Sequence, residues 1–99
     1  MGGGTLASLE FITYRNKLED HIKRGWHWLS SSEQLVAQVV VYILPTGVVR
    51  DAQIVQSSGR SDFDESALRA VFKASPVPPA PEGLYDKFRE VRITFDSQR

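Results

Sequence analysis

The sequence contains no cysteine, which excludes disulfide bonds, thiolate catalysis and cysteine-ligated metal sites. It also has no excess charge of either sign, because 12 Lys and Arg residues balance 12 Asp and Glu residues. Phosphate binding needs a surplus of cationic side chains, so this balance disfavours a sheet-based nucleic-acid module. No apolar run approaches the roughly 18 residues of a membrane span. We therefore expect neither nucleic acid nor membrane contact from this stretch of chain.

Histidine, the side-chain type that ordinarily titrates near neutral pH, occurs only as His21 and His27. The two are six residues apart across a predicted helix end, and no third ligand accompanies them. We therefore predict a solvated His21 and a partly packed His27 in place of a metal or acid–base site.

Motifs for nucleophilic catalysis are also lacking. Ser57-Ser58-Gly59 has neither the nucleophile-elbow pattern nor the glycine and lysine spacing of a phosphate loop, so it is predicted to be a turn. Asp62, Asp64 and Glu65 cluster at a predicted helix start, where carboxylates are more often caps than a catalytic pair. We expect no catalytic residue, no metal and no cofactor.

The chain of 99 residues is long enough for one domain with one modest hydrophobic core. Gly2 to Gly4 have the composition of a linker or a cloning remnant, so residues 1–5 are assigned to that segment and residues 6–99 to the domain. The chain is then expected to be a piece of a longer protein.

The strongest pattern lies between Val36 and Val55, where two apolar runs flank Leu44-Pro45-Thr46-Gly47. Pro45 cannot continue a paired strand and Gly47 accepts a positive φ, so the pattern predicts a β-hairpin. In the first strand, alternation predicts a core face made of Val39, Val41 and Ile43. The opposite face is predicted to carry Val40, Tyr42 and Leu44.

The return strand of this hairpin does not keep a period of two. Val49 lies three residues before Ala52, which itself shares a face with Ile54. A β-bulge near Arg50 or Asp51 would restore the register, because a bulge adds one residue to one strand.

Two amphipathic helices are predicted on either side of the hairpin. The first runs from Leu6 to Lys23 and stops near Gly25. Its apolar stripe comprises Phe11, Tyr14, Leu18, Ile22 and Trp26. The second is capped by Asp62 or Asp64 and ends before Ser75-Pro76. Its predicted buried stripe comprises Ala67, Leu68, Val71 and Phe72.

Residues 76–81 are too rich in proline for a helix or a central strand and are predicted to form a stiff extended strap. The last predicted strand runs from Phe88 to Phe95. Its inward side chains are Val91, Ile93 and Phe95, and its outward side chains are Arg92, Thr94 and Asp96. The order α-β-β-α-β predicts an α+β fold, a two-layer sandwich in which a three-stranded sheet packs against two helices.

An open sheet has two edges, whose free N–H and C=O groups can pair with a partner strand. The last strand is a predicted edge, so its backbone is the candidate partner-binding site. The residues of this site are Val91, Arg92, Ile93, Thr94, Phe95 and Asp96. Charged side chains on the strand could equally serve only to protect the edge, and that alternative stays open. Proline at Ile93, or at another residue whose N–H faces outward, is the predicted way to block pairing.

In order and spacing, several short motifs resemble the TonB/TolA C-terminal domain family. They are Tyr14 with Ile22 and Trp26, the strand-turn-strand closed by Gly47, Ser57-Ser58-Gly59, Phe63-Asp64, and Ala67 with Ala70. The resemblance covers nearly the whole chain from about Phe11. Ala74-Ser75-Pro76-Val77-Pro78-Pro79 and the ending Phe88 to Phe95 are more similar to the TolA branch than to the TonB branch.

The resemblance implies a periplasmic domain of an inner-membrane-anchored protein, with a left-handed crossover and with partner strands added at the sheet edge. The implied partners are TolB and the lipoprotein Pal, while TolQ and TolR would contact a membrane segment outside this chain. In some bacteria, colicins and filamentous-phage coat proteins exploit such domains.

We therefore expect a monomeric, non-enzymatic adaptor that transmits proton-motive force across the cell envelope. The alternatives are a TonB-type domain that grips outer-membrane receptor peptides and, in a different class, a small enzyme.

Overall fold

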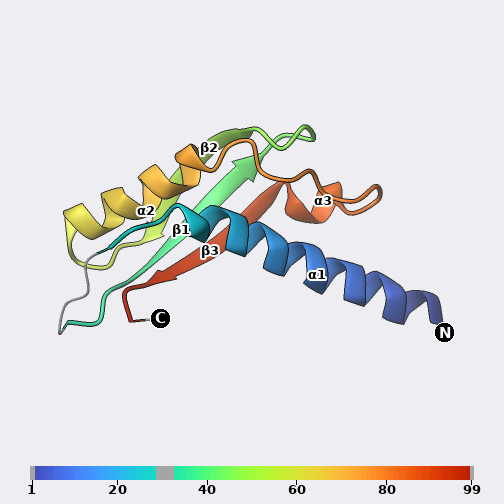
Figure 1. Cartoon of the computed structure of the whole chain (residues 1–99), viewed down its shortest axis with the longest axis horizontal. Coiled ribbons are helices and arrows are strands. Elements are labelled where there is room, and N and C mark those ends of the chain that lie inside the picture. The colour runs from blue at the N-terminus through green and yellow to red at the C-terminus, as the bar shows by residue number, and fades with distance from the viewer. Residues whose placement is uncertain (1, 29–32, 99) are drawn as a thin grey trace.

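The computed structural model describes residues 2–28 and 33–98, with the side chains of the helix from residue 9 onward. The elements are α1 (Gly2–Arg24), β1 (Val36–Ile43), β2 (Val49–Gln56), α2 (Ser61–Lys73), α3 (Tyr85–Phe88) and β3 (Glu90–Asp96) (Figure 1). The predicted α-β-β-α-β order is therefore confirmed, with one short helix, α3, added before the last strand.

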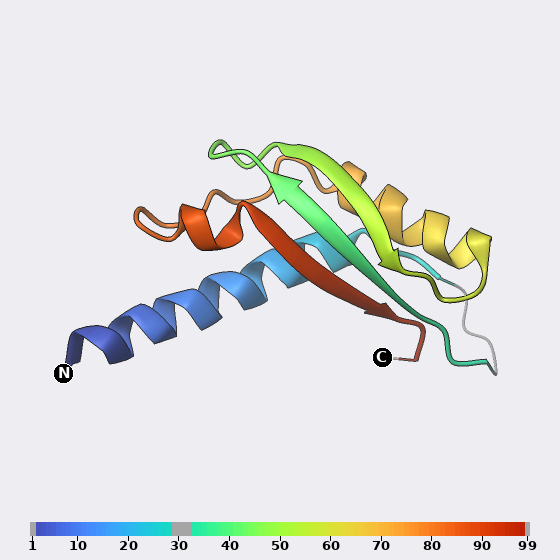
Figure 2. The ribbon, with the colours of Figure 1, turned by 180° about the vertical axis from the view of Figure 1, so that it is seen from behind.

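The sheet has the strand order β2-β1-β3, and β1 is antiparallel to both neighbours. Helices α1 and α2 lie on the same side of this sheet, so the predicted two-layer α+β arrangement is confirmed (Figures 1 and 2). With the helices toward the viewer and β2 and β3 pointing up, β3 lies to the left of β2. The β2–α2–β3 crossover is therefore left-handed, against the usual preference for right-handed connections.

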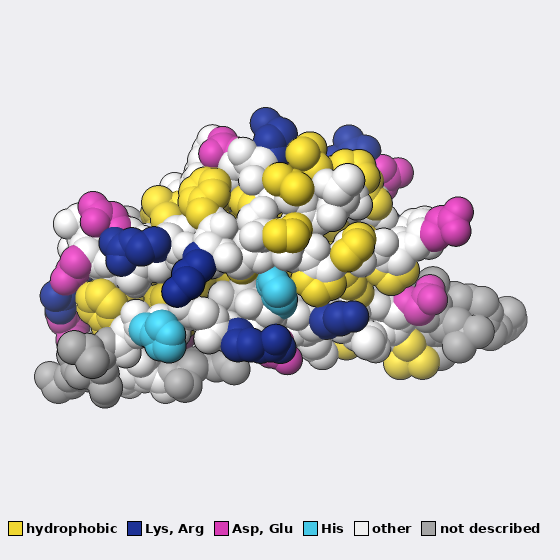
Figure 3. Space-filling view, turned by 45° about the horizontal axis from the view of Figure 1, so that its top comes forward, with side chains coloured by type: hydrophobic (Ala, Val, Ile, Leu, Met, Phe, Trp, Pro, Cys, Tyr) yellow, Lys and Arg dark blue, Asp and Glu magenta, His cyan; other side chains and the backbone are white. Residues whose placement is uncertain are grey.

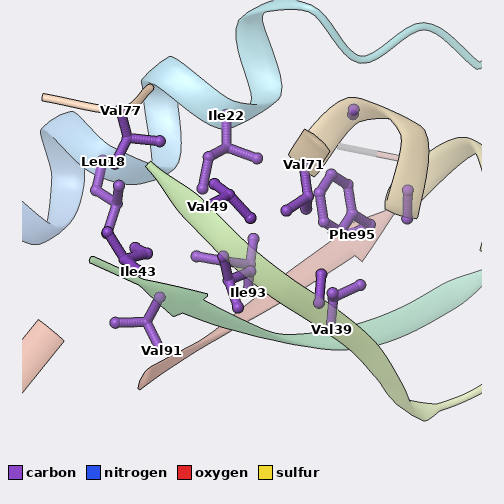
Figure 4. Packing of buried hydrophobic residues seen from close by; sticks show 14 of the residues in the cluster. Leu18, Ile22, Val39, Ile43, Val49, Val71, Val77, Val91, Ile93 and Phe95 are labelled. Atoms are coloured by element: carbon purple, nitrogen blue, oxygen red, sulfur yellow. The ribbon is translucent and has the colours of Figure 1, made fainter. Parts of the chain in front are cut away.

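The core lies between the sheet and the helices, where side chains from every strand meet α1 and α2 (Figure 4). The predicted core face of β1 is confirmed, because Val39, Val41 and Ile43 are buried. The predicted inward residues of β3 are also buried, and they are Val91, Ile93 and Phe95. Burying each large apolar side chain contributes about 1.5–3 kcal/mol, so this layer supplies most of the driving force for folding.

The hairpin contains the bulge that the sequence predicted. Tyr42 pairs with Asp51 and Ile43 pairs with Val49, which leaves Arg50 as the extra residue. A second irregularity in the β1–β2 register lies between Gln38 and Val39. The first bulge places Val49 on the same buried face as Ala52, which repairs the broken period of the return strand.

Two expected helix details are wrong. Phe72, predicted to be buried, is 47% exposed, and Ala70 is buried in its place. Neither Asp62 nor Asp64 caps α2, because the helix already begins at Ser61 and its N-cap residue is Arg60, with no side-chain cap hydrogen bond. The buried stripe of α2 therefore consists of Phe63, Ala67, Ala70 and Val71, which pack in the core with residues of the sheet and of α1.

Asp64 instead holds the loop between β2 and α2. Its carboxylate accepts hydrogen bonds from the Ser58 amide (2.9 Å), from Ser58 Oγ (2.7 Å) and from Ser57 Oγ. Partial burial alone would raise the pKa of Asp64, but these hydrogen bonds outweigh burial and lower the pKa below its usual value.

The proline-rich segment lies across the hairpin and α1 as the predicted strap, with no helix or strand between Ser75 and Pro81. Its anchor is Val77, whose side chain is buried and whose N–H donates to Gly47 O (2.8 Å). Tyr14 Oη donates to Pro78 O (2.5 Å), which ties the strap to α1. The turn at Gly47, the strap and α1 are thus fixed to one another.

We predict that Gly47→Ala lowers the free energy of unfolding by roughly 3 kcal/mol or more. Gly47 has φ +96°, and a Cβ added there would lie 2.1 Å from Val77 O. The matched control is Gly59→Ala, because Gly59 also has a positive φ (+94°) but nothing lies within 4 Å of its added Cβ. That control should lose about 1 kcal/mol in urea unfolding. Equal losses in the two variants would contradict the Val77 contact.

Asp64→Asn is expected to lower the free energy of unfolding at pH 7 by about 1 kcal/mol, because the charged acceptor of the loop is lost. A lowered pKa in the folded state means that the stabilisation is complete above the unfolded value of about 3.9 and disappears as the pH falls through the folded value. In urea unfolding, the difference from the wild type should therefore be full at pH 7 and should shrink progressively as the pH is lowered from about 4 toward 2. Glu65→Gln, in the same turn of α2, is the control and should show no such loss.

Candidate partner-binding edge

Strand β3 forms one free edge of the sheet. It pairs with β1 on one side, and the strand order places no other strand beyond it. Figure 2 shows β3 at the border of the sheet, with α1 extending past it on the helical side. The predicted edge position of the last strand is therefore confirmed.

Two hydrogen bonds fix which backbone groups of β3 face outward. Ile43 N–H donates to Arg89 O (2.9 Å) and Ser97 N–H donates to Leu35 O (2.9 Å), and both pairs share the register in which Val39 faces Ile93. In an antiparallel pair, bonded and non-bonded residues alternate, so odd-numbered residues of β3 bond to β1. The N–H and C=O groups of Arg92 and Thr94 therefore point away from the sheet.

This phase corrects the expectation that proline at Ile93 would block only partner pairing. The N–H of Ile93 faces β1, so proline there would remove a hydrogen bond of the native sheet. The sequence does not reveal whether the odd-numbered or the even-numbered residues of β3 bond to β1. The alternation of buried and exposed side chains is the same in both cases. Arg92 and Thr94 are the positions to test.

The six predicted site residues divide into two sets. Val91, Ile93 and Phe95 are buried and attach the strand to the core. The side chains of Arg92 and Thr94 are exposed, and Asp96 is partly exposed and accepts a hydrogen bond from Gln34 Nε2 (3.1 Å). The buried set thus holds the strand against the core, and the side chains of the other set are accessible to solvent. Partner binding by these residues stays a prediction.

The opposite edge, at β2, is partly closed by side chains. The Val49 amide donates to Ser75 Oγ (3.0 Å), and the Ala52 amide donates to Asp51 Oδ1 (2.8 Å). These bonds occupy two amides that a partner strand would need. The two edges are therefore unequal, and two β2 amides have side-chain acceptors of this kind.

A flank of α1 borders the open edge. Lys23 Nζ lies 5.9 Å from the centre of the Phe95 ring, and Arg15 pairs with Glu19 (3.2 Å) at helical spacing before it. One turn earlier, Ile12 is 53% exposed. The exposed surface of α1 is therefore apolar at Ile12 and charged at the Arg15–Glu19 pair.

The histidine predictions are reversed. His21 is half-buried and its Nε2–H donates to Ala74 O (2.9 Å), whereas His27 is exposed. The crossing of α1 under the end of α2 accounts for this, since it brings His21 against the last turn of α2. Within residues 2–28 and 33–98, no group of three His, Cys, Asp or Glu side chains could hold a metal ion. Among these residues no helix is long and apolar enough to cross a membrane.

A family model described as TonB C terminal matches residues 12–95. The chain belongs to the TonB C-terminal family. Protein TonB of Pasteurella multocida (strain Pm70) is 33% identical over 79 residues, which are 76% of this chain and 31% of that protein. Tol-Pal system protein TolA of Pseudomonas aeruginosa is 31% identical over 70 residues, which are 67% of this chain and 20% of that protein. The chain therefore spans less than a third of either relative.

One solved structure has a similar fold. It is the solution NMR structure of TolAIII bound to a peptide derived from the N-terminus of TolB. The match has a TM-score of 0.74 and 26% identity, and it covers 85% of this chain and 72% of that one. The expected likeness to the TonB/TolA family is thus confirmed, and the lean toward TolA is consistent with this structural match.

We expect amide hydrogen exchange to show directly which amides of β3 bond to β1 and which face outward. The amides of Val91, Ile93 and Phe95 bond to β1 and should exchange slowly, whereas those of Arg92 and Thr94 should exchange at least tenfold faster. Exchange monitored residue by residue by NMR measures this alternation. Uniform protection along the strand would mean that the edge is already covered.

Proposed function

We propose that this TonB-family domain is the partner-binding end of a TolA-like envelope protein and that it captures an extended segment of TolB by adding it to β3. The observation that carries the proposal is the inequality of the two edges. β3 leaves the backbone of Arg92 and Thr94 unpaired, while side chains occupy amides of β2. Main-chain bonds to a guest strand would supply affinity, and alternate side chains would supply specificity.

The relative solved with a TolB-derived peptide supports the choice of partner. On the same proposal the domain is periplasmic, monomeric and non-enzymatic. An inner-membrane anchor and the contacts with TolQ and TolR would lie in parts of the protein outside this chain. Pal, colicins and phage coat proteins would be further binding partners of the domain.

A second candidate is a TonB-type domain that grips the terminal peptide of an outer-membrane receptor. The 33% identity with protein TonB of Pasteurella multocida favours it. Both candidates use the same edge, so the peptide that binds decides between them. Titration of the domain with a TolB N-terminal peptide and with a receptor peptide, followed by amide NMR, separates the two.

We predict that Thr94→Pro weakens binding of the TolB peptide at least tenfold, because proline removes an outward N–H and a main-chain bond to the guest. Thr94→Val is the matched control, since it changes the side chain but keeps the N–H, and it should bind within about twofold of the wild type. Calorimetric titration measures both affinities, and the amide NMR spectrum of each variant checks that the sheet is intact.

The same idea can be tested on the guest without altering the domain. N-methylation of the TolB peptide at alternate residues should abolish binding in one phase and leave it nearly unchanged in the other, because only every second amide of an added strand faces β3. Equal tolerance of both phases, or shifts confined to α1 and α2 in the titration, would count against strand addition.

A further inference from the structure

A cationic groove runs along the seam between α1 and α2, on the helical face of the molecule and away from the edge of β3. Its first hollow, of about 400 Å³, is lined by His21, Arg24 and Lys73 together with small and apolar residues. The second, of about 200 Å³, is lined by His27, Arg69 and Lys73. Both hollows share Gly25, Ala70 and Lys73, so they form one continuous groove.

No acidic side chain belongs to the described lining of either hollow. Figure 3 shows lysine, arginine and histidine side chains gathered along a band of this face. This segregation occurs in a chain whose net charge is zero, so the acidic residues lie mainly elsewhere. The seam is therefore a local region of positive potential.

The cations of the seam are not used in ion pairs of the fold. Among the described side chains, the four ion pairs involve Arg15, Arg60 and Arg89, and none involves Arg24, Arg69 or Lys73. Asp20 and Glu65 lie one helical turn before Arg24 and Arg69 but form no ion pair with them. Three exposed cations on one groove thus have no acidic partner among the described side chains.

We propose that this seam binds an acidic, extended protein segment, at a site separate from the strand-binding edge. Charge complementarity gives the sign of the partner. The concave shape favours a chain over a bilayer, because a flat headgroup layer contacts protruding side chains and cannot follow a groove. Gly25, which has no side chain, and Ala70, which has only a methyl group, line both hollows and let a backbone approach closely.

The spacing of the cations suits alternating acidic residues. Arg69 and Lys73 are four residues apart on α2 and therefore about 6 Å apart along the helix axis. Every second side chain of an extended chain is about 6.7 Å apart and lies on the same face. A segment with a carboxylate at every second residue can therefore place successive charges over Arg69 and Lys73, with Arg24 across the seam.

The test uses the 99-residue chain and a capped peptide of five Ser-Glu repeats, with five Ser-Gln repeats as the uncharged probe. We expect the acidic peptide to bind and the uncharged one not to bind. Affinity should fall at least tenfold when sodium chloride rises from 50 to 200 mM, because exposed charges are screened. Fluorescence anisotropy of the labelled peptide measures both effects.

The triple variant Arg24→Gln/Arg69→Gln/Lys73→Gln should weaken the acidic peptide at least tenfold. The matched control Arg15→Gln/Arg50→Gln/Lys87→Gln removes the same charge from exposed residues outside the groove lining and should change affinity less than threefold. Equal losses in the two variants would show that only net charge matters, and unchanged binding by the first variant would also overturn the proposal.

Other occupants of the groove would give different results. Binding to phosphatidylglycerol vesicles that needs the three cations, without binding of the acidic peptide, would identify a membrane contact instead. Self-association in sedimentation that the triple variant abolishes would identify a second copy of this chain. Either result overturns the proposal. Thr94→Pro should leave acidic-peptide binding intact, and the triple variant should leave TolB-peptide binding intact, so failure of one site is distinguishable from failure of the other.

Discussion

The central position of β1 is the constraint on which the rest of the structure depends. Because β1 pairs with β2 through the hairpin and with β3 on its other side, both of its edges are used and both remaining strands must lie at edges. Its side chains Val39, Val41 and Ile43 then anchor the helical layer. An edge strand with one paired and one open side follows from this arrangement, since β3 is held by its buried residues on one face and by β1 on one side.

The rest of the chain makes the two edges unequal. The strap from Ser75 to Pro81 closes over the hairpin end, where Val77 bonds to Gly47 and Ser75 occupies the Val49 amide. Asp51 occupies the next accessible amide of β2. These contacts leave β3 as the edge with the more accessible backbone. Under the proposed function, they would favour strand addition at β3 over strand addition at β2.

The balance of charge over the whole chain conceals a local separation of charge. The net charge of zero argues correctly against a broadly cationic surface of the kind that binds nucleic acid. It does not show where the charged residues lie in the folded chain. The tertiary fold brings the end of α1 against α2 and gathers Arg24, Arg69 and Lys73 along one seam. Strand addition at β3 and charge recognition at this seam would use different faces and different forces, one insensitive to salt and one screened by it.

The sequence by itself determined the features that depend on near neighbours: the hairpin and its bulge at Arg50, the end of α2 before Ser75-Pro76, and the alternation of buried residues in β3. Local steric limits and the period of a strand govern these, so residue identity is sufficient. The tertiary structure alone decided the order of the strands, the outward N–H groups of Arg92 and Thr94, the exposure of Phe72 and the partner of His21. Each depends on which element packs against which, and residues far apart in the chain make that choice: 53 positions for His21 and Ala74, and 62 for Leu35 and Ser97.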